Sequence, residues 1–477
     1  MNARTATTAF IAALLLGGIT YVALRQRPAP SVTSINSRLP LATNATGFTI
    51  GQRGESVTFV LDPSLDAWLI TGGAGETAWP AEPGAVQGAL RMIRDLSRLP
   101  GTPTLPPPAD TTTDLLLTIP NSPDLTLRIA SQSLGGTTRV YEVLQDGNAI
   151  EVSAPTATTD LFQPRSTLLW RRADLLAAPG TPTDIRVQTN SATLAFKQVD
   201  GKWTLMLPVP APVDPAAMKE LLSASLPAKK FVSKQEPAAP LTNLRDPVAT
   251  ITRTSRLAAS GPGGTSVRLI TEVTIGSAAD TAQETFYASA IARKETLAVN
   301  RPDGAGGVAW GPVQAAVDGS SVTAIAKTPD FYVSKRAVQS PSADVSRLRV
   351  LPADGAFDFA TPLAGSGVPA AEFTRTIDGW TNADKPLSPQ ESDRIAGVLA
   401  LLCDTPCARV HLQGLGTPIV PVCTLAVTSV SGGLLDNVGV GIDESASTIY
   451  IRSGRVIREY TSDKAGTALE TLRGWTR

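Results

Sequence analysis

The sequence predicts an α+β protein in which one N-terminal transmembrane helix precedes repeated strand-rich modules, each an antiparallel sheet with one or two packing helices. The chain has 477 residues and 5 % aromatic residues, with 39 glycines and 38 prolines, a composition that favours short strands joined by many turns. Residues 47–61 alternate apolar and polar side chains as half-buried strands do. A chain this long is expected to form two to four domains.

The clearest module lies at residues 199–226. Asp200-Gly201 is a two-residue hairpin signal, and Trp203 begins a β-rich run that ends in a proline-rich loop. Asp214 is the predicted N-cap of a helix with Pro215 at its first position, and apolar residues continue along one helix face. The segment therefore predicts strand, turn, tryptophan strand, loop and helix.

Two looser copies of this module surround Trp68 and Trp380. In the third copy, Ser388-Pro389-Gln390-Glu391 predicts a capping box at the helix start. Each module is followed by a strand-rich partner unit, and a helix is predicted at 160–176. The wide spacing indicates long-period duplication instead of a solenoid. We expect five segments: an anchor at 1–27, a linker at 28–46, and module pairs at 47–180, 181–340 and 341–477.

The N-terminal segment predicts a single-pass membrane protein. Residues 6–24 carry no charge and, as a helix, would extend roughly 28 Å, close to the thickness of a bilayer's hydrocarbon core. A buried helix and a cleaved signal peptide are the alternatives, although VAL-RQR offers no clear cleavage site. Because a long hydrophilic chain after one N-terminal span is usually translocated, we expect the bulk of the protein to be extracytoplasmic.

The charge balance argues against nucleic-acid binding. Lys+Arg and Asp+Glu both number 42, so no net field draws the protein toward a polyanion. The single histidine, His411, limits acid–base and metal chemistry, and no nucleophile motif surrounds it. We therefore expect no catalytic residues and no cofactor.

The three cysteines allow several interpretations. Cys403, Cys407, His411 and Cys423 could hold a tetrahedral zinc ion, although their spacing is loose. A disulfide between Cys403 and Cys407 is the better expectation for an oxidising compartment, and unpaired buried cysteines are the remaining alternative.

The module pattern resembles a bacterial family called domain of unknown function 4340. The best match is Asp200-Gly201-Lys202-Trp203 with Pro212-Val213-Asp214-Pro215 and Leu221-Leu222, whereas the chain departs from the pattern at 74–83 and 365–371. The resemblance implies a membrane-anchored protein, often encoded beside ABC-type transporter subunits of the gliding-motility-associated kind. It implies no catalytic residues.

These observations lead to a non-enzymatic accessory or interaction protein of a transport or cell-envelope assembly. Trp68, Trp203 and Trp380 are interpreted as structural residues that anchor a hairpin to a helix. The first alternative is a solute- or glycan-binding protein with clefts between modules, whose stacking surfaces would be Trp79, Trp170 or Trp310. The second is a hydrolase or zinc enzyme built around His411.

Overall fold

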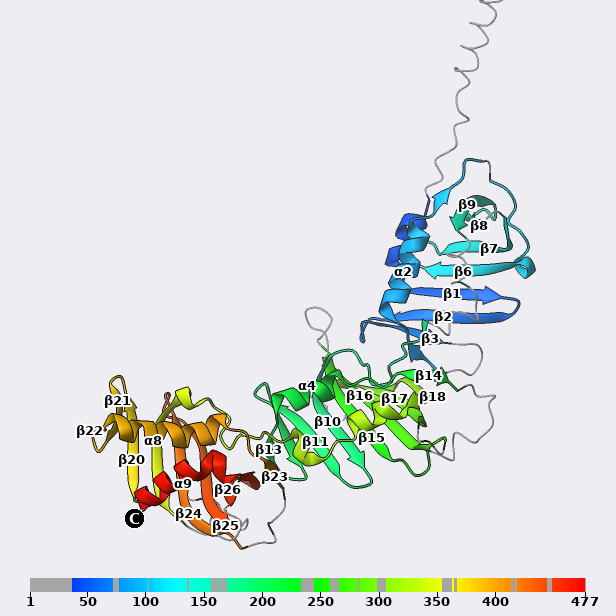
Figure 1. Ribbon diagram of the computed structural model, residues 1–477. Helices are drawn as coiled ribbons and strands as arrows, with labels where there is room; N and C mark the ends of the chain where they lie inside the picture. Colours follow the sequence, from blue (N-terminus) through cyan, green and yellow to red (C-terminus); the bar gives the residue numbers. More distant parts are fainter. Residues whose placement is uncertain are drawn as a thin grey trace, which may run out of the picture. The chain divides into compact units, whose positions relative to one another are not determined.

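A computed structural model gives the fold. It describes residues 37–476 except 72–76, 102, 135–136, 156–161, 163–169, 233–243, 258–265, 281, 283, 298–305, 354–362, 364–366, 413–414, 416–417 and 444–447. Within these residues the chain forms three nine-stranded antiparallel sheets (Figure 1). By contacts it divides into two compact units, of which the first contains the first sheet and the second contains the other two.

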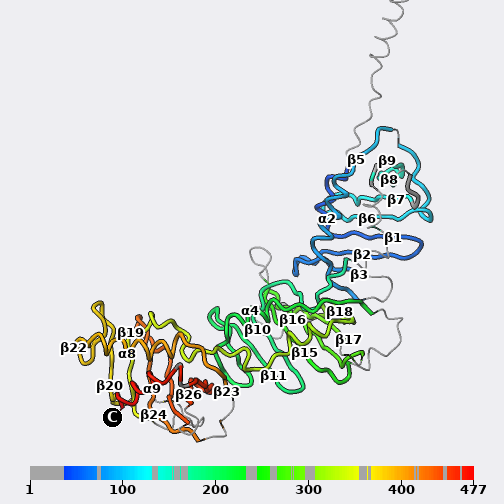
Figure 2. Tube along the Cα trace, viewed as in Figure 1, coloured from blue at the N-terminus to red at the C-terminus, as the bar shows by residue number. Residues whose placement is uncertain are grey.

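The strand order is the same in all three sheets. It runs β4-β3-β2-β1-β6-β7-β8-β9-β5 in the first sheet, and adding nine, then eighteen, to each label gives the other two. We call these units repeat 1 (β1–β9), repeat 2 (β10–β18) and repeat 3 (β19–β27). The repetition predicted from the sequence is confirmed, and Figure 2 traces the successive repeats along the chain.

The predicted α+β class is wrong, because the described residues form mostly antiparallel sheet. Within the described residues, one α-helix interrupts the nine strands of each repeat, and strands continue on both sides of it. The module and its partner unit, predicted as separate packing units, share one sheet because their first strands pair, as in β1 with β6. The fold class is therefore determined by strand pairing across the whole repeat more than by the helix propensity of short segments.

The described residues of repeat 1 form the α-helix α2 (Pro83–Arg94), after the short 3-10 helix η1 (Leu39–Asn44). A second 3-10 helix is η2 (Ala109–Thr111). Its strands are β1 (Gly47–Gln52), β2 (Glu55–Asp62), β3 (Ala67–Thr71), β4 (Trp79–Pro80), β5 (Ser97–Arg98), β6 (Thr112–Thr118), β7 (Leu125–Leu134), β8 (Thr137–Val143) and β9 (Ala149–Pro155).

Repeat 2 contains α4 (Pro215–Ser223) and is followed by α6 (Gly319–Ile325) and α7 (Pro329–Tyr332). Its strands are β10 (Thr181–Thr189), β11 (Thr193–Val199), β12 (Lys202–Leu207), β13 (Ala211–Pro212), β14 (Ala228–Phe231), β15 (Ala249–Leu257), β16 (Ser266–Ala278), β17 (Thr285–Leu297) and β18 (Gly306–Asp318).

Repeat 3 begins after η4 (Ser342–Asp344) and contains α8 (Pro389–Leu399), the π-helical turn η5 (Ala400–Asp404) and α9 (Ser462–Thr476). Its strands are β19 (Val345–Pro352), β20 (Ala371–Thr376), β21 (Gly379–Asn382), β22 (Lys385–Pro386), β23 (Arg409–His411), β24 (Val420–Ser429), β25 (Leu434–Asp443), β26 (Thr448–Ser453) and β27 (Val456–Tyr460).

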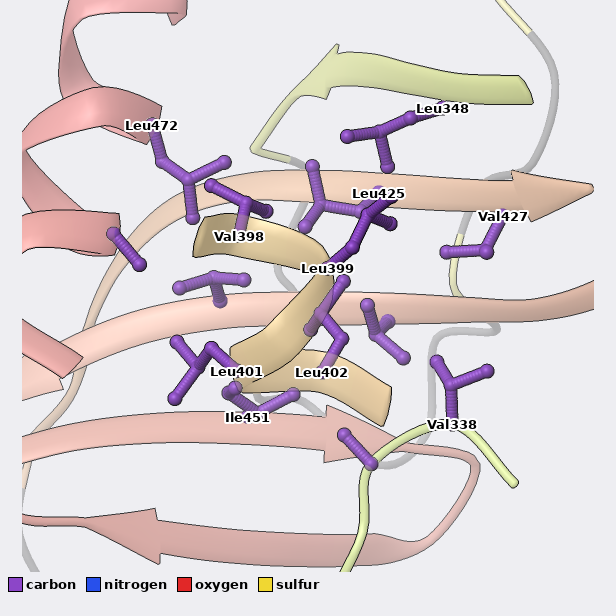
Figure 3. Close-up of a cluster of buried hydrophobic side chains, with 14 of the residues drawn as sticks. Val338, Leu348, Val398, Leu399, Leu401, Leu402, Leu425, Val427, Ile451 and Leu472 are labelled. Atoms are coloured by element: carbon purple, nitrogen blue, oxygen red, sulfur yellow. The ribbon is translucent and has the colours of Figure 1, made fainter. Parts of the chain in front are cut away.

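One face of each sheet carries the core. In repeat 1, Phe48 and Ile50 of β1 are buried with Val86 and Leu90 of α2. In repeat 3, the end of α8 and η5 place four apolar side chains over β24 and β26, and Leu472 of α9 joins them, as Figure 3 shows: Val398, Leu399, Leu401 and Leu402. The apolar faces of these helices therefore pack against their sheets.

Two further expectations concern helices. Of the helix predicted at 160–176, the described residues 171–176 are not helical, because Arg171 and Asp174 lie in β-bridges to Ala81 and Pro227. The transmembrane helix expected at 6–24 lies outside the described residues. Among residues 37–476 that the structure describes, no helix is both long and apolar enough to cross a membrane.

Candidate functional site at the helix edge of each repeat

The three predicted tryptophans occupy one equivalent position. Each lies in the third strand of its repeat, and the residue after it pairs with a proline of the fourth strand: Leu69 with Pro80, Thr204 with Pro212, and Thr381 with Pro386. Three residues further on, Pro83, Pro215 and Pro389 begin the helices. Trp68 and Trp380 are each 8 % exposed, and Trp203 is half-buried.

The residues before these helices differ in how they cap the helix, and one of the three makes no side-chain cap. Asp214 accepts hydrogen bonds from the amides of Ala216 and Ala217 at 2.8 and 3.1 Å, as predicted for an N-cap aspartate. Ser388 and Glu391 form the predicted capping box, in which the Ser388 amide donates to Glu391 Oε2 at 2.9 Å. The Glu82 side chain makes no capping bond.

An aromatic residue at the end of each repeat packs against an equivalent phenylalanine of the second strand. The ring centroids are 5.2 Å apart for Trp170 and Phe59, 5.0 Å for Tyr332 and Phe196, and 4.6 Å for Trp475 and Phe373. The phenylalanines are equivalent because each pairs with the residue two places after the repeat's tryptophan. We call Trp170, Tyr332 and Trp475 the plug residues.

In repeats 1 and 2 the plug residue also forms a backbone hydrogen bond with the residue directly before the helix. The amide of Glu82 donates to the carbonyl of Trp170, and that of Asp214 to the carbonyl of Tyr332, both at 2.8 Å. The next residues complete β-bridges, Arg171 with Ala81 and Val333 with Val213. An extended chain segment therefore extends each sheet by one residue pair at this edge.

Repeat 3 lacks this closure within the described residues. Trp475 lies in α9, and the next residue, Thr476, stays in that helix, where its hydroxyl donates to the carbonyl of Leu472. Trp475 is only half-buried, whereas Trp170 and Tyr332 are 4 % and 1 % exposed. The amide of Ser388, equivalent to that of Asp214, is satisfied by Glu391 instead.

The segment after Tyr332 joins the core of repeat 3. Ser334 donates its amide to the carbonyl of Pro212 at 3.0 Å and accepts from Nε of the buried Arg458, also at 3.0 Å. The Val338 amide then donates to the carbonyl of Leu402 at 2.9 Å. Residues 332–338 are therefore fixed to both repeats of the second unit.

The cysteines of the zinc and disulfide hypotheses are all free and buried in the core of repeat 3. The structure contains no bond between Cys403 and Cys407, and no group of three or more His, Cys, Asp or Glu that could hold a metal occurs within the described residues. Burial raises the pKa of the Cys403 and Cys423 thiols to about 12. Burial also raises the pKa of Cys407, so these groups are poor nucleophiles as placed.

His411 is separated from this cysteine group by its place in the sheet. It lies on the edge strand β23, where Nε2 is 2.9 Å from Oε2 of Glu459 on β27. The Tyr450 ring is 6.4 Å away between centroids. The hydrogen bond holds the imidazole against the neighbouring strand.

The tryptophans considered as stacking surfaces are all inside the protein. Trp79, Trp170 and Trp310 are 2 %, 4 % and 1 % exposed. A sugar ring needs access to one face of an aromatic ring, so these three residues give no support to the glycan-binding alternative.

The second face of each sheet, opposite the helix, differs between repeats. On this face, one row of residues that are paired from strand to strand crosses the middle of each sheet, and the row occupies the same position in all three repeats. In repeat 2 it is neutral and polar, exposed or half-buried: Thr193, Gln188, Thr250, Thr274, Ser289 and Gln314. In repeat 1 the row carries charges and a tyrosine: Asp114, Arg128, Tyr141 and Glu151. In repeat 3 it is buried: Leu351, Thr424, Gly439, Arg452 and Ile457.

A comparison with protein-family models, curated proteins and solved structures finds no match to this chain. The resemblance to domain of unknown function 4340 therefore stays a prediction.

The sequence pattern missed the plug residues and their phenylalanine partners. Phe59, Phe196 and Phe373 stand seven to nine residues before the predicted tryptophans, which is a detectable signal once the tryptophans are aligned. The plugs have no such local signal, because each is separated from its phenylalanine by most of a repeat. Only the fold brings these aromatic pairs together.

Proposed function

We propose that this protein is a non-enzymatic interaction subunit of a transport or cell-envelope assembly, anchored in the membrane by residues 6–24 with its repeats outside the cytoplasm. The observation that carries the proposal is the tandem repetition of one module whose sheet is covered by a helix on one face and accessible on the other in repeats 1 and 2. Tandem modules of this kind provide extended surfaces for protein partners.

The chemistry of the accessible faces supports a protein partner. Repeat 2 combines the neutral polar row with flanking ion pairs, Arg268 to Glu295 at 3.3 Å and Arg293 to Glu272 at 3.8 Å. Repeat 1 carries an exposed apolar pair on the same face, Val60 at 47 % and Leu116 at 41 %. A surface of mixed polar and apolar groups with paired charges is typical of non-obligate protein interfaces.

Site-specific photo-crosslinking in membranes tests this proposal. A photoreactive residue at Thr252 or Thr274, on the accessible face of β15 and β16, should capture a discrete partner band. The matched control is Lys219, which is exposed on helix α4 of the same repeat. Equal labelling from all three positions, or no band from Thr252 and Thr274, would argue against the accessible face as the interaction surface.

The membrane part is tested separately by topology. A reporter fused after residue 477 should be active only when exported, and alkaline carbonate should fail to extract the protein from membranes. A reporter that is active only in the cytoplasm would overturn the extracytoplasmic placement.

A further inference from the structure

We infer that the helix edge of repeat 3 is an acceptor site for an extended, aromatic-bearing segment of a partner protein. The site consists of β22, Leu387 and Ser388, next to the half-buried plug Trp475. Its equivalents in repeats 1 and 2 are occupied by segments of this chain, which define what the site binds.

The geometry of the occupant follows from repeat 2. There the segment is antiparallel to residues 212–214: Tyr332 accepts from the Asp214 amide at 2.8 Å, and the Ser334 amide donates to the carbonyl of Pro212 at 3.0 Å. The Tyr332 ring meanwhile packs against Phe196 at 5.0 Å. The occupant is thus a β-forming segment with an aromatic residue directly before the bridge position.

Among the described residues, repeat 3 presents the same groups without that occupant. Pro386 and Lys385 are exposed, and no described residue forms a bridge with Leu387 equivalent to those of Ala81 and Val213. The Ser388 amide donates to the side chain of Glu391, an exposed partner that a backbone carbonyl can replace. Strand addition of this kind obtains its affinity from main-chain hydrogen bonds and its specificity from side-chain pockets.

The aromatic pocket of repeat 3 is filled by a residue that is held less firmly than its equivalents. Trp475 lies at the end of α9 and is half-buried, while Tyr332 is 1 % exposed. An incoming aromatic side chain competes with Trp475 for the position beside Phe373, where the present centroid distance is 4.6 Å. Trp475 therefore occupies the acceptor site until a competing aromatic side chain displaces it.

A peptide-binding experiment with the full chain tests the inference. The probe is a fluorescent synthetic peptide of residues 329–338, PDFYVSKRAV, and the matched control peptide carries Tyr332→Ala. We expect the tyrosine peptide to bind at least about tenfold more tightly by fluorescence anisotropy, because the buried aromatic ring is the anchor. Substitution Trp475→Ala in the protein should strengthen binding further by releasing the pocket.

Amide hydrogen exchange identifies the edge that binds. The Ser388 amide should gain protection in the complex while that of Asp214 stays unchanged. Equal affinity of the two peptides, no binding to folded Trp475→Ala protein, or altered exchange at Asp214 would overturn the inference. If Trp475→Ala fails to fold by circular dichroism, Trp475→Leu provides the same test with less loss of core volume.

Discussion

Repeats 2 and 3 use different partners to satisfy the backbone amide of the residue before their helices. In repeat 2 the amide of the N-cap residue, Asp214, donates to the carbonyl of Tyr332, more than a hundred residues later in the chain. In repeat 3 the equivalent amide, of Ser388, donates to Glu391 three residues away. The same backbone amide can therefore be satisfied by a segment distant in the chain or by a local motif, and only the local motif can be recognised in the sequence.

The largest expected difference between these repeats is in thiol chemistry, since all cysteines belong to repeat 3. With pKa values of about 12, Cys403 and Cys423 are thiolates in about one molecule in ten thousand at pH 8. A disulfide reagent should therefore titrate neither thiol rapidly in the native protein, but three thiols per chain in urea. Recovery of a single thiol in urea would instead indicate the disulfide that the sequence allows.

The next effect concerns the plug of repeat 2. Tyr332→Ala should lower the free energy of unfolding by about 3–5 kcal/mol, because it empties a fully buried aromatic site beside Phe196. The matched control is the neighbouring Phe331, which is 36 % exposed, and its change to Ala should cost far less. Urea denaturation measures both. Equal losses would mean that the plug has no special role.

A smaller effect is expected at the capping box of repeat 3. Ser388→Ala should cost about 1 kcal/mol, because it removes the hydroxyl that accepts from the Glu391 amide at 3.3 Å. Combined with Tyr332→Ala, its effect should be additive, because the amide of Ser388 is satisfied by Glu391 of the same helix. A double-mutant cycle in urea measures this, and coupling between Ser388 and Tyr332 would contradict the local closure.

The smallest effect is a pH dependence confined to repeat 3. Burial raises the pKa of Asp436, although hydrogen bonds from Ser453 and the Asn437 backbone and the nearby Arg458 oppose the shift. A carboxyl with a raised folded-state pKa binds protons more tightly in the folded protein, so its contribution to stability falls as pH rises above the unfolded value of about 3.9.

The substitution Asp436→Asn should remove this slope. The equivalent position in repeat 2 is the buried, neutral Thr271, which contributes no titration. Urea unfolding of both proteins between pH 4 and 7 measures the difference. If the free energy of unfolding of the wild-type protein instead rises relative to that of the variant over this interval, the surroundings stabilise the carboxylate, and the expected direction is wrong.

Local signals explain what the sequence could predict. Pro215 and Pro389 with their caps identified helix starts, and Trp68, Trp203 and Trp380 identified three copies of a module. These features depend on residues close together in the chain.

Long-range pairing explains what it could not. β1 and β6 are separated by a helix and four strands, so nothing local shows that module and partner share one sheet. In the described residues of the predicted helix 160–176, the helical pattern fails at Arg171, because Arg171 forms a β-bridge with Ala81 and the carbonyl of Trp170 accepts from the Glu82 amide. For the candidate site, the sequence supplied the tryptophans and caps, whereas the plugs required the fold.

The short edge strands have a consequence for how such a protein could lengthen during evolution. Each sheet ends on one side in a two-residue strand whose second residue is a proline: Pro80, Pro212 or Pro386. Proline has no amide hydrogen to offer a further strand, so this edge accepts a short segment through the proline carbonyl and the residues that follow, as in repeat 2, but does not favour pairing with a long strand. A duplicated unit therefore carries an edge that limits continuous growth of its sheet, and new copies add as separate sheets.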